Sequence, residues 1–373
     1  MKQPVRILLV HLVSMGDCLF VTALARQIKQ DYPGCHLTWA ISNRCSQVIQ
    51  NNPYVDEIWE VFSEKMSDNF GFVWEQTKRE AIARKENGLY DLIFFTQIIP
   101  DNLSNYDGTT RSSTFRSYPN PITVPVSPII ILTDEEIDSV RIFARQNKLQ
   151  EFDKVILFEC SPQSKQSPVN LNFAIELSNK IVDEFEDCVI LLTSNQKINA
   201  GHPRIIDASD LSFRENAELS KYCNLLIGCS SGITWLLTST WAKKIPTIQI
   251  LNNRSLLFSF ASVSYDLKYW GQSIDHIIEI TNSADQYVFN CIEMTLEDGV
   301  EKARNNYNEV LTPDVTSLES MVRRFIHAKQ FREIIKVSRN YYNRNKDPSV
   351  IIIVPYAVVK TIIVYILNIV KKL

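Results

Sequence analysis

Short apolar runs alternate with stretches of helical periodicity over the first hundred residues. The run Val5–Val10 predicts a buried strand, and Phe20, Leu24 and Ile28 recur every four residues on the helix expected after it. Such alternation is typical of βαβ units, in which helices connect parallel strands. Three more strands and one mostly solvated helix are predicted, the strands over Leu37–Ile41, Glu57–Val61 and Asp91–Thr96 and the helix over Val73–Glu86.

A second alternation of strands and helices follows residue 130. Two successive arrays predict an α/β protein with two Rossmann-like domains and a cleft where the carboxyl ends of their sheets face each other. The predicted limits are residues 1–150 and 151–320, followed by a tail over residues 321–373. The strands predicted here are Val155–Phe158, Cys188–Thr193, Leu225–Gly228 and Thr247–Leu251, and the helices are Asp134–Gln146, Leu171–Phe185, Phe213–Tyr222 and Ile233–Ala242.

The tail combines a basic stretch with an apolar one. Residues 321–346 carry eight Lys and Arg side chains against Glu333 alone, and the apolar segment Val350–Leu373 follows, interrupted by Pro355, Lys360 and Asn368. This order predicts docking on an anionic membrane surface, to which both basic and apolar side chains contribute. A membrane-spanning helix is an alternative that the three interruptions disfavour. Packing against the protein itself, or against a second subunit of a homo-oligomer, is another.

Composition narrows the function classes. The 373 residues carry 39 Lys and Arg against 42 Asp and Glu, so a formal net charge of -3 leaves no global basic field, and nucleic acid is not an expected partner. The eight cysteines are scattered without a C-x-x-C pair, which argues against a structural zinc module and gives no sign of a disulfide framework. A reducing cytoplasm is the expected compartment.

Several nucleotide and metal motifs are missing. No two glycines are separated by a single residue, so neither G-x-G-x-x-G nor a Walker A loop can be written. D-x-D and H-E-x-x-H are absent too. These absences argue against ordinary dinucleotide oxidoreductases, P-loop NTPases, many metal-dependent glycosyltransferases and catalytic zinc sites.

Two turns that lead from a strand into a helix carry candidate chemistry. In Ser14–Asp17 the carboxylate lies where a helix dipole favours its ionised form, so Asp17 could act as a general base on a hydroxyl. The alternative is that it only caps a helix beginning at Leu19. In Gly228–Gly232, free N–H groups and two hydroxyls could bind a diphosphate, unless a serine there is an ordinary helix cap. Lys165 could add a positive charge, or simply be solvated.

These segments together resemble the glycosyltransferase family 9 heptosyltransferases. The family opens with a strand, an S-x-G-D turn and a helix that ends in an A-x-P-like sequence, as Ile7–Val10, Ser14–Asp17 and Tyr32-Pro33 do here. Lys165–Pro168 resembles the family's K-x-W-P loop, and Gly228–Gly232 resembles its G-x-D-[ST]-G turn. The resemblance extends over roughly residues 5–251, with the three loops in the family's order.

The resemblance implies a GT-B fold and inverting transfer from a nucleotide-activated sugar, with no metal and no other cofactor. It implies that Asp17 is the base and that four residues hold the donor diphosphate. By matched position, these four are Ser161, Lys165, Ser231 and Gly232.

Three positions depart from the family pattern. Ser230 stands where the family usually has Asp, Trp235 where it often has His, and Ser167 where the loop has Trp. The loss of an acid and an imidazole near the donor puts ADP-heptose in doubt and favours another sugar nucleotide. Arg111 and Arg116 lie in a Pro-rich polar segment, Asp101–Pro128. They could bind an anionic acceptor group, or face water in a disordered loop.

We therefore expect an inverting, metal-independent glycosyltransferase acting on lipopolysaccharide or a related bacterial surface glycan, peripheral at the cytoplasmic face of the inner membrane. A catalytically inactive nucleotide-sugar-binding or scaffold protein is the alternative. A UDP-sugar 2-epimerase would need an acidic and histidine set that cannot be assembled here. Besides Asp17, the candidate residues are Ser161, Lys165, Ser194, Ser230, Ser231, Gly232 and Trp235 for the donor and Ser14, Gly16, Arg111 and Arg116 for the acceptor.

Overall fold

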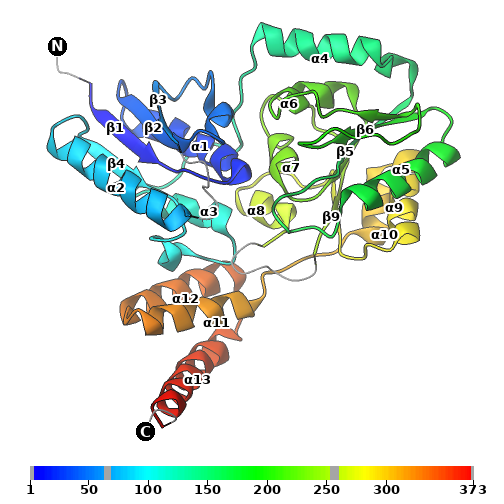
Figure 1. Ribbon diagram of the computed structural model, residues 1–373. Helices are drawn as coiled ribbons and strands as arrows, with labels where there is room; N and C mark the ends of the chain where they lie inside the picture. The colour runs from blue at the N-terminus through cyan, green and yellow to red at the C-terminus, as the bar shows by residue number, and fades with distance from the viewer. Residues whose placement is uncertain (1–3, 63–68, 253–259, 371–373) are drawn as a thin grey trace. The chain divides into compact units, whose positions relative to one another are not determined.

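The computed structural model describes residues 4–62, 69–252 and 260–370, which form two parallel β-sheets (Figure 1). The first sheet has the strand order β3-β2-β1-β4, and β2 pairs in parallel with both β1 and β3. All four strands were predicted to within one residue at either end. Their bounds, with those of the helices between them, are β1 Arg6–Val10, α1 Met15–Asp31, β2 His36–Ser42, η1 Ser46–Ile49, β3 Glu57–Val61, α2 Phe70–Glu86 and β4 Leu92–Phe95.

The second sheet has the order β10-β9-β8-β5-β6-β7, and every pairing in it is parallel. Numbered within this sheet, the strands run 3-2-1-4-5-6 from the β7 edge, which is the order of a Rossmann fold. The sequence predicted four of these strands and missed the short β7 and β10. The strand bounds are β5 Lys154–Glu159, β6 Cys188–Thr193, β7 Ile205–Asp207, β8 Leu225–Gly228, β9 Thr247–Ile250 and β10 Ile277–Ile280.

Both faces of the second sheet are covered by helices (Figure 1). Ile156 and Phe158 of β5 pack on the side of α5, α9 and α10, whereas Val155 and Leu157 pack on the side of α4 and α6. Alternate side chains point to opposite faces of a strand, so burial on both sides requires a continuous apolar run. The helix bounds are α4 Asp134–Gln146, η4 Leu149–Glu151, α5 Leu171–Glu184, α6 Glu215–Leu219, η5 Ser220–Tyr222, α8 Val263–Tyr269, α9 Asp285–Glu297 and α10 Val300–Tyr307.

One predicted helix is much shorter than expected. The sequence predicts a helix over Ile233–Ala242, but α7 covers only Gly232–Leu236. The Thr238 hydroxyl donates to the Trp235 carbonyl at 2.7 Å, and the Thr240 N–H bonds to the Pro128 carbonyl at 3.0 Å. Because the Thr240 N–H bonds to Pro128 and not to the carbonyl four residues earlier, the helical hydrogen-bond pattern does not continue beyond the first turn.

Contacts divide the described chain into two compact units. Unit 1 contains the whole second sheet and the first sheet as far as Ile93 of β4, and it spans Met1–Ile93, Thr123–Asn253 and Ala261–Leu311. Unit 2 combines Phe94–Ile122, Arg254–Phe260 and Thr312–Leu373. The predicted limits at residues 150 and 320 separate the two sheets along the chain, and as domain boundaries they stay a prediction.

Unit 2 is mainly helical. Its apolar core joins Leu103 and Tyr106 to Met321 and Val337, and α11 and α12 lie side by side (Figure 1). Across residues 4–62, 69–252 and 260–370, no helix is both long and apolar enough to cross a lipid bilayer. The bounds in this unit are η2 Leu103–Asn105, α3 Thr110–Thr114, η3 Phe115–Ser117, α11 Val315–His327, α12 Phe331–Asn345 and α13 Val350–Val370.

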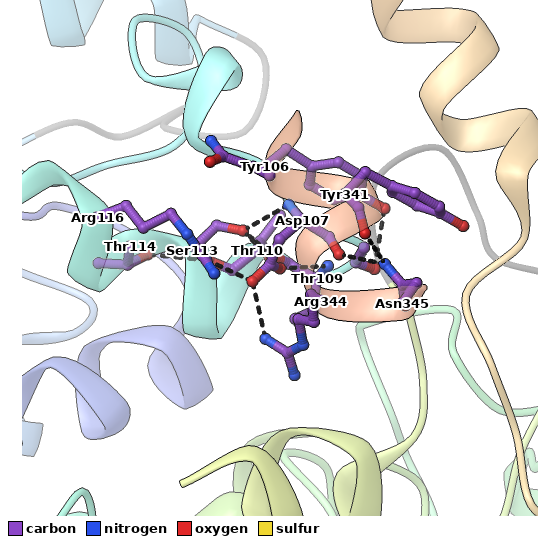
Figure 2. A network of polar contacts seen from close by, with 12 residues as sticks. Tyr106, Asp107, Thr109, Thr110, Ser113, Thr114, Arg116, Tyr341, Arg344 and Asn345 are labelled. Carbon is purple, nitrogen blue, oxygen red and sulfur yellow. Dashed lines mark hydrogen bonds and ion pairs between the residues drawn. The ribbon is translucent and has the colours of Figure 1, made fainter. Parts of the chain in front are cut away.

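A buried polar network, shown in Figure 2, organises the Pro-rich segment. The fully buried Asp107 carboxylate forms ion pairs with Arg116 and with Arg344, the latter at 3.0 Å, and accepts from the Ser113 hydroxyl at 2.9 Å. Asn345 donates to the Asp107 carbonyl at 2.7 Å. The expectation of a disordered loop with arginines facing water is therefore wrong, because Arg116 pairs with the buried Asp107 and Arg344 of α12 adds a second cation to the same carboxylate.

Candidate functional site

The predicted turns lie where each sheet reverses its strand order. In the first sheet the reversal falls between β1 and β4, and in the second between β5 and β8. Ligands of open α/β sheets bind outside the carboxyl ends of the strands at such switch points. Ser14–Asp17 follows β1, Gly228–Gly232 follows β8, and the loop with Ser161 and Lys165 follows β5. The structure thus places three separate sequence motifs at the two expected positions.

Each of these three loops contains a non-glycine residue with a positive φ angle. The φ angles are 73° at Ser14, 56° at Lys165 and 50° at Ser230. Residues with a side chain rarely adopt this region unless the surroundings hold them there. Asn252 donates to the Lys165 carbonyl at 2.9 Å, and the Ser230 N–H donates to Gln249 Oε1 at 2.8 Å. The loops that contain Lys165 and Ser230 are therefore held by Gln249 of β9 and by Asn252, which follows β9.

Within unit 1, the turn after β1 contacts the turn after β8. A Cβ atom on Gly16 would lie 2.9 Å from Cδ1 of Trp235, and one on Gly232 would lie 3.8 Å from Cβ of Met15. The Phe20 ring meets the Trp235 ring edge to face, with 5.8 Å between the centroids. Glycine at position 16 therefore lets the N-terminal turn of α1 approach α7, and the two motifs lie side by side.

Asp17 lies in the first turn of α1 and is half-buried. Because α1 begins at Met15, the N-cap is Ser14, and the alternative that Asp17 caps a helix starting at Leu19 is wrong. An acidic side chain in the first turn is stabilised in its charged form by the helix dipole. The position suits a base, and that role stays a prediction.

Two thiols lie near Asp17, a pair that the scattered cysteine spacing did not predict. The pKa of the Cys45 thiol is lowered, chiefly because the Cys18 thiol hydrogen-bonds to it. Burial is the main cause that raises the pKa of Cys18, and the Asp17 charge also acts to raise it. The Ser14 backbone also hydrogen-bonds to the Cys45 thiol. Cys45, the residue just before η1, thus contacts the Ser14–Asp17 turn and the first part of α1.

A buried carboxylate at the end of β5 holds the second turn. Glu159 accepts hydrogen bonds from the Cys229 N–H at 3.0 Å, the Ile233 N–H at 3.1 Å and the Thr234 hydroxyl at 2.8 Å, and also from the Ser231 hydroxyl. Its side chain is almost fully buried. The predicted anion site is therefore partly filled by the protein's own carboxylate. The only sequence signal for this role of Glu159 is that an acidic residue directly follows the apolar run Val155–Phe158.

Two donors of the turn remain available. Within the described chain, the backbone N–H groups of Ser231 and Gly232 form no hydrogen bond, and both residues are half-buried. The Ser231 hydroxyl is engaged by Glu159, and Ser230 is buried. A phosphate oxygen could still bind the two N–H groups, since adjacent N–H groups in a turn form an anion-binding concavity.

The other donor-side candidates occupy neighbouring loops. The Ser161 hydroxyl donates to Asn195 Oδ1 at 3.4 Å, and the Ser194 hydroxyl accepts from the Gln196 N–H at 3.1 Å. Lys165 is exposed, as a residue meeting a phosphate from solvent must be. Ser161, Ser194 and Lys165 thus follow the adjacent strands β5 and β6.

The remaining candidates have structural contacts of their own. Trp235 is buried against α1, so it supports the contact between the two turns. Arg111 and Arg116 belong to unit 2, where Arg111 donates to the Phe260 carbonyl at 2.9 Å and Arg116 pairs with Asp107. Among the residues that the structure describes, no three His, Cys, Asp or Glu side chains converge to hold a metal ion.

Comparison with known proteins adds fold-level similarity. No family profile matches the sequence, and no curated protein matches it. The fold is similar to a glycosyl transferase family 9 protein from Veillonella parvula DSM 2008, with a TM-score of 0.53 and 14% identity over 81% of this chain and 94% of that one. It is also similar to the E. coli ADP-heptose LPS heptosyltransferase II, with a TM-score of 0.50 and 13% identity over 79% and 99%. These similarities confirm the predicted GT-B fold and, at the level of fold, the resemblance to family 9.

Proposed function

We propose that this protein is an inverting glycosyltransferase that moves a sugar from a nucleotide-sugar donor to a saccharide of lipopolysaccharide or a related bacterial surface glycan. The observation that carries the proposal is the contact between the Ser14–Asp17 turn and the Gly228–Gly232 turn, each at the switch point of its own sheet. This contact supports the proposal because it brings the proposed base and the proposed diphosphate-binding turn close together.

The proposed reaction is a single displacement. The Asp17 carboxylate takes the proton from an acceptor hydroxyl as that oxygen forms a bond to the anomeric carbon. The bond from this carbon to the diphosphate oxygen breaks on the opposite face, so the configuration inverts. The nucleoside diphosphate leaves with the bonding electron pair, and Asp17 ends the step protonated.

The leaving diphosphate gains negative charge and needs stabilisation. The N–H groups of Ser231 and Gly232 supply hydrogen bonds that are already oriented, and the Lys165 ammonium supplies charge. Glu159 opposes this by placing a carboxylate behind the same turn. Lys165 and the two N–H groups must therefore outweigh Glu159 for the donor to bind.

The first experiment is a thermal-shift screen of the full chain against ADP, UDP, GDP, CMP and their common sugars. A ligand that binds the native state raises the unfolding midpoint by mass action, so the screen identifies the nucleotide without knowledge of the acceptor. We expect one sugar nucleotide to stabilise the wild type. Lys165→Ala should abolish the shift, and Asp17→Asn should keep it while abolishing transfer to saccharide acceptors.

Lys302→Ala on α10 is the matched control, because it removes an exposed lysine far along the chain from the three loops. It should leave both the shift and the transfer unchanged. If no nucleotide raises the midpoint, or if Asp17→Asn transfers sugar as fast as the wild type, the proposed function is wrong.

A second candidate function is a catalytically inactive nucleotide-sugar-binding or scaffold protein. The specific observation in its favour is that Glu159 occupies donors that a diphosphate would otherwise use. Ser230 and Trp235, at positions where the family has an acid and often an imidazole, point the same way. A donor that binds with no turnover on a panel of lipid-linked saccharides would favour this candidate.

A further inference from the structure

Helix α13 leaves one apolar face uncovered. Val350 and Ala357 pack into the core of unit 2, and Thr361 lies on the same side of the helix. The opposite side is apolar as well, and Ile352 on it is 73% exposed. A helix that is apolar on both faces needs a second apolar surface to cover it. The exposed residues recur at helical spacing, and this α13 face consists of Ile352, Tyr356, Val359 and Ile363.

Helix α12 presents an apolar stripe beside a cationic one. Its buried side carries Ile334 and Tyr341. On the other side, Phe331 and Ile335 are 62% and 72% exposed. Arg332 and Lys336 follow directly after these two residues in sequence. Arg339 lies three residues after Lys336, and all three cations share a face because residues three and four positions apart are neighbours on a helix. This α12 stripe consists of Phe331, Ile335, Arg332, Lys336 and Arg339.

The cations of the α12 stripe are uncompensated. Within the described chain, Arg332, Lys336 and Arg339 take part in no ion pair, and all three are exposed. Some other cations of unit 2 are paired, since Arg344 pairs with Asp107 and Lys360 lies 3.5 Å from Glu319. Three exposed, unpaired cations therefore lie on the helix that also exposes Phe331 and Ile335, and Arg324 and Lys329, just before this helix in sequence, are exposed and unpaired as well within the described chain.

We propose that the α13 face and the α12 stripe dock this protein on the surface of an anionic lipid bilayer. Apolar side chains of both helices would enter the boundary between head groups and acyl chains, while the three cations meet anionic head groups. A second copy of the chain fits less well, because it would bring one cationic stripe against another. The docking does not depend on the proposed function.

The test is co-flotation of the full-length protein with vesicles. Vesicles of phosphatidylcholine mixed with phosphatidylglycerol should carry the protein upward, and raised salt should release much of it because salt screens the head-group attraction. Vesicles of phosphatidylcholine alone should bind it far more weakly. Equal binding to both vesicle types would overturn the electrostatic part of the proposal, and no binding to either would overturn all of it.

Charge variants locate the surface. Replacing Arg332, Lys336 and Arg339 together by Gln should lower the partition onto anionic vesicles about a hundredfold, at about fivefold for each charge removed. The matched control removes the same number of exposed cations from α4 and α10, and it should bind as the wild type does. Its substitutions are Arg141→Gln, Arg145→Gln and Lys302→Gln.

Apolar variants separate the bilayer from a second copy of the chain. The pair Ile352→Ser and Ile363→Ser should abolish vesicle binding and leave the unfolding midpoint unchanged, since both side chains are exposed. Ile142→Ser, at an exposed isoleucine of α4, is the control. One combined result would contradict the proposal: the wild type sediments as a dimer, the double variant sediments as a monomer, and neither protein binds vesicles. The α13 face would then be a subunit interface and not a membrane-docking surface.

Discussion

Two histidines of unit 1 make its stability depend on pH. Burial lowers the pKa of His11 to about 3 and that of His276 to about 4. At pH 5 both histidines are neutral in the folded protein but mostly protonated in the unfolded chain. The stability is therefore fully present above the pKa of an unfolded histidine and decreases as the pH falls below it. Each histidine should lower the free energy of unfolding by about 2 kcal/mol when the pH is lowered from 7 to 5.

The measurement is urea unfolding at pH 7 and pH 5. The loss on acidification should shrink by about 2 kcal/mol in His276→Gln, because that variant no longer takes up the proton on unfolding. His327→Gln, at an exposed position of α11, should keep the wild-type loss. An equal loss in all three proteins would show that His276 is not held neutral.

Single residues also show how far the sequence could predict the candidate site. Asp17 and Lys165 could be singled out because each belongs to a short motif between a strand and a helix. Glu159 could not, because the groups that it binds lie about 70 positions further along the chain. Nothing in the local sequence shows which of two neighbouring turns a carboxylate will support. The contact between Gly16 and Trp235 escaped prediction for the same reason.

At the scale of elements, Glu159 fixes the connection between β8 and α7. In Glu159→Gln, one acceptor oxygen becomes an NH₂ group that faces donors, either the Cys229 N–H or the Ile233 N–H. A buried donor left without an acceptor costs about 1–3 kcal/mol, so urea unfolding should shift by that amount. Glu184→Gln, at the exposed end of α5, should be neutral. Equal midpoints for the two variants would contradict the role assigned to Glu159.

Elements were predicted best where burial on both faces imposes an uninterrupted apolar run. The buried strands β6 and β8 have the predicted bounds, β5 extends one residue further at each end, and β9 ends one residue earlier. Prediction failed where polar side chains form the interior. The segment from Phe94 to Ile122 is polar in sequence, yet its folded form depends on an ion-pair network completed by a helix more than 200 residues away.

At the scale of the whole molecule, Asp107 joins distant parts of unit 2. In Asp107→Asn, the arginines at positions 116 and 344 lose their common carboxylate, and breaking a buried pair in this way costs about 3–5 kcal/mol. Limited proteolysis of the full chain should therefore cleave unit 2 well before unit 1. Asp138→Asn removes an exposed partner of Arg141 on α4 and should leave the cleavage pattern unchanged. Identical patterns for the two variants would contradict the role of Asp107.

The discontinuous composition of unit 2 has a consequence for biosynthesis. Its first segment ends at Ile122, and its last begins at Thr312. At roughly 5–20 residues per second on the ribosome, about 10 to 40 s separate the emergence of these two segments. Leu103, Tyr106 and Asp107 reach solvent long before their helical partners exist. A nascent chain must therefore postpone this part of its folding until the last stage of translation, which gives chaperones a defined interval in which to act.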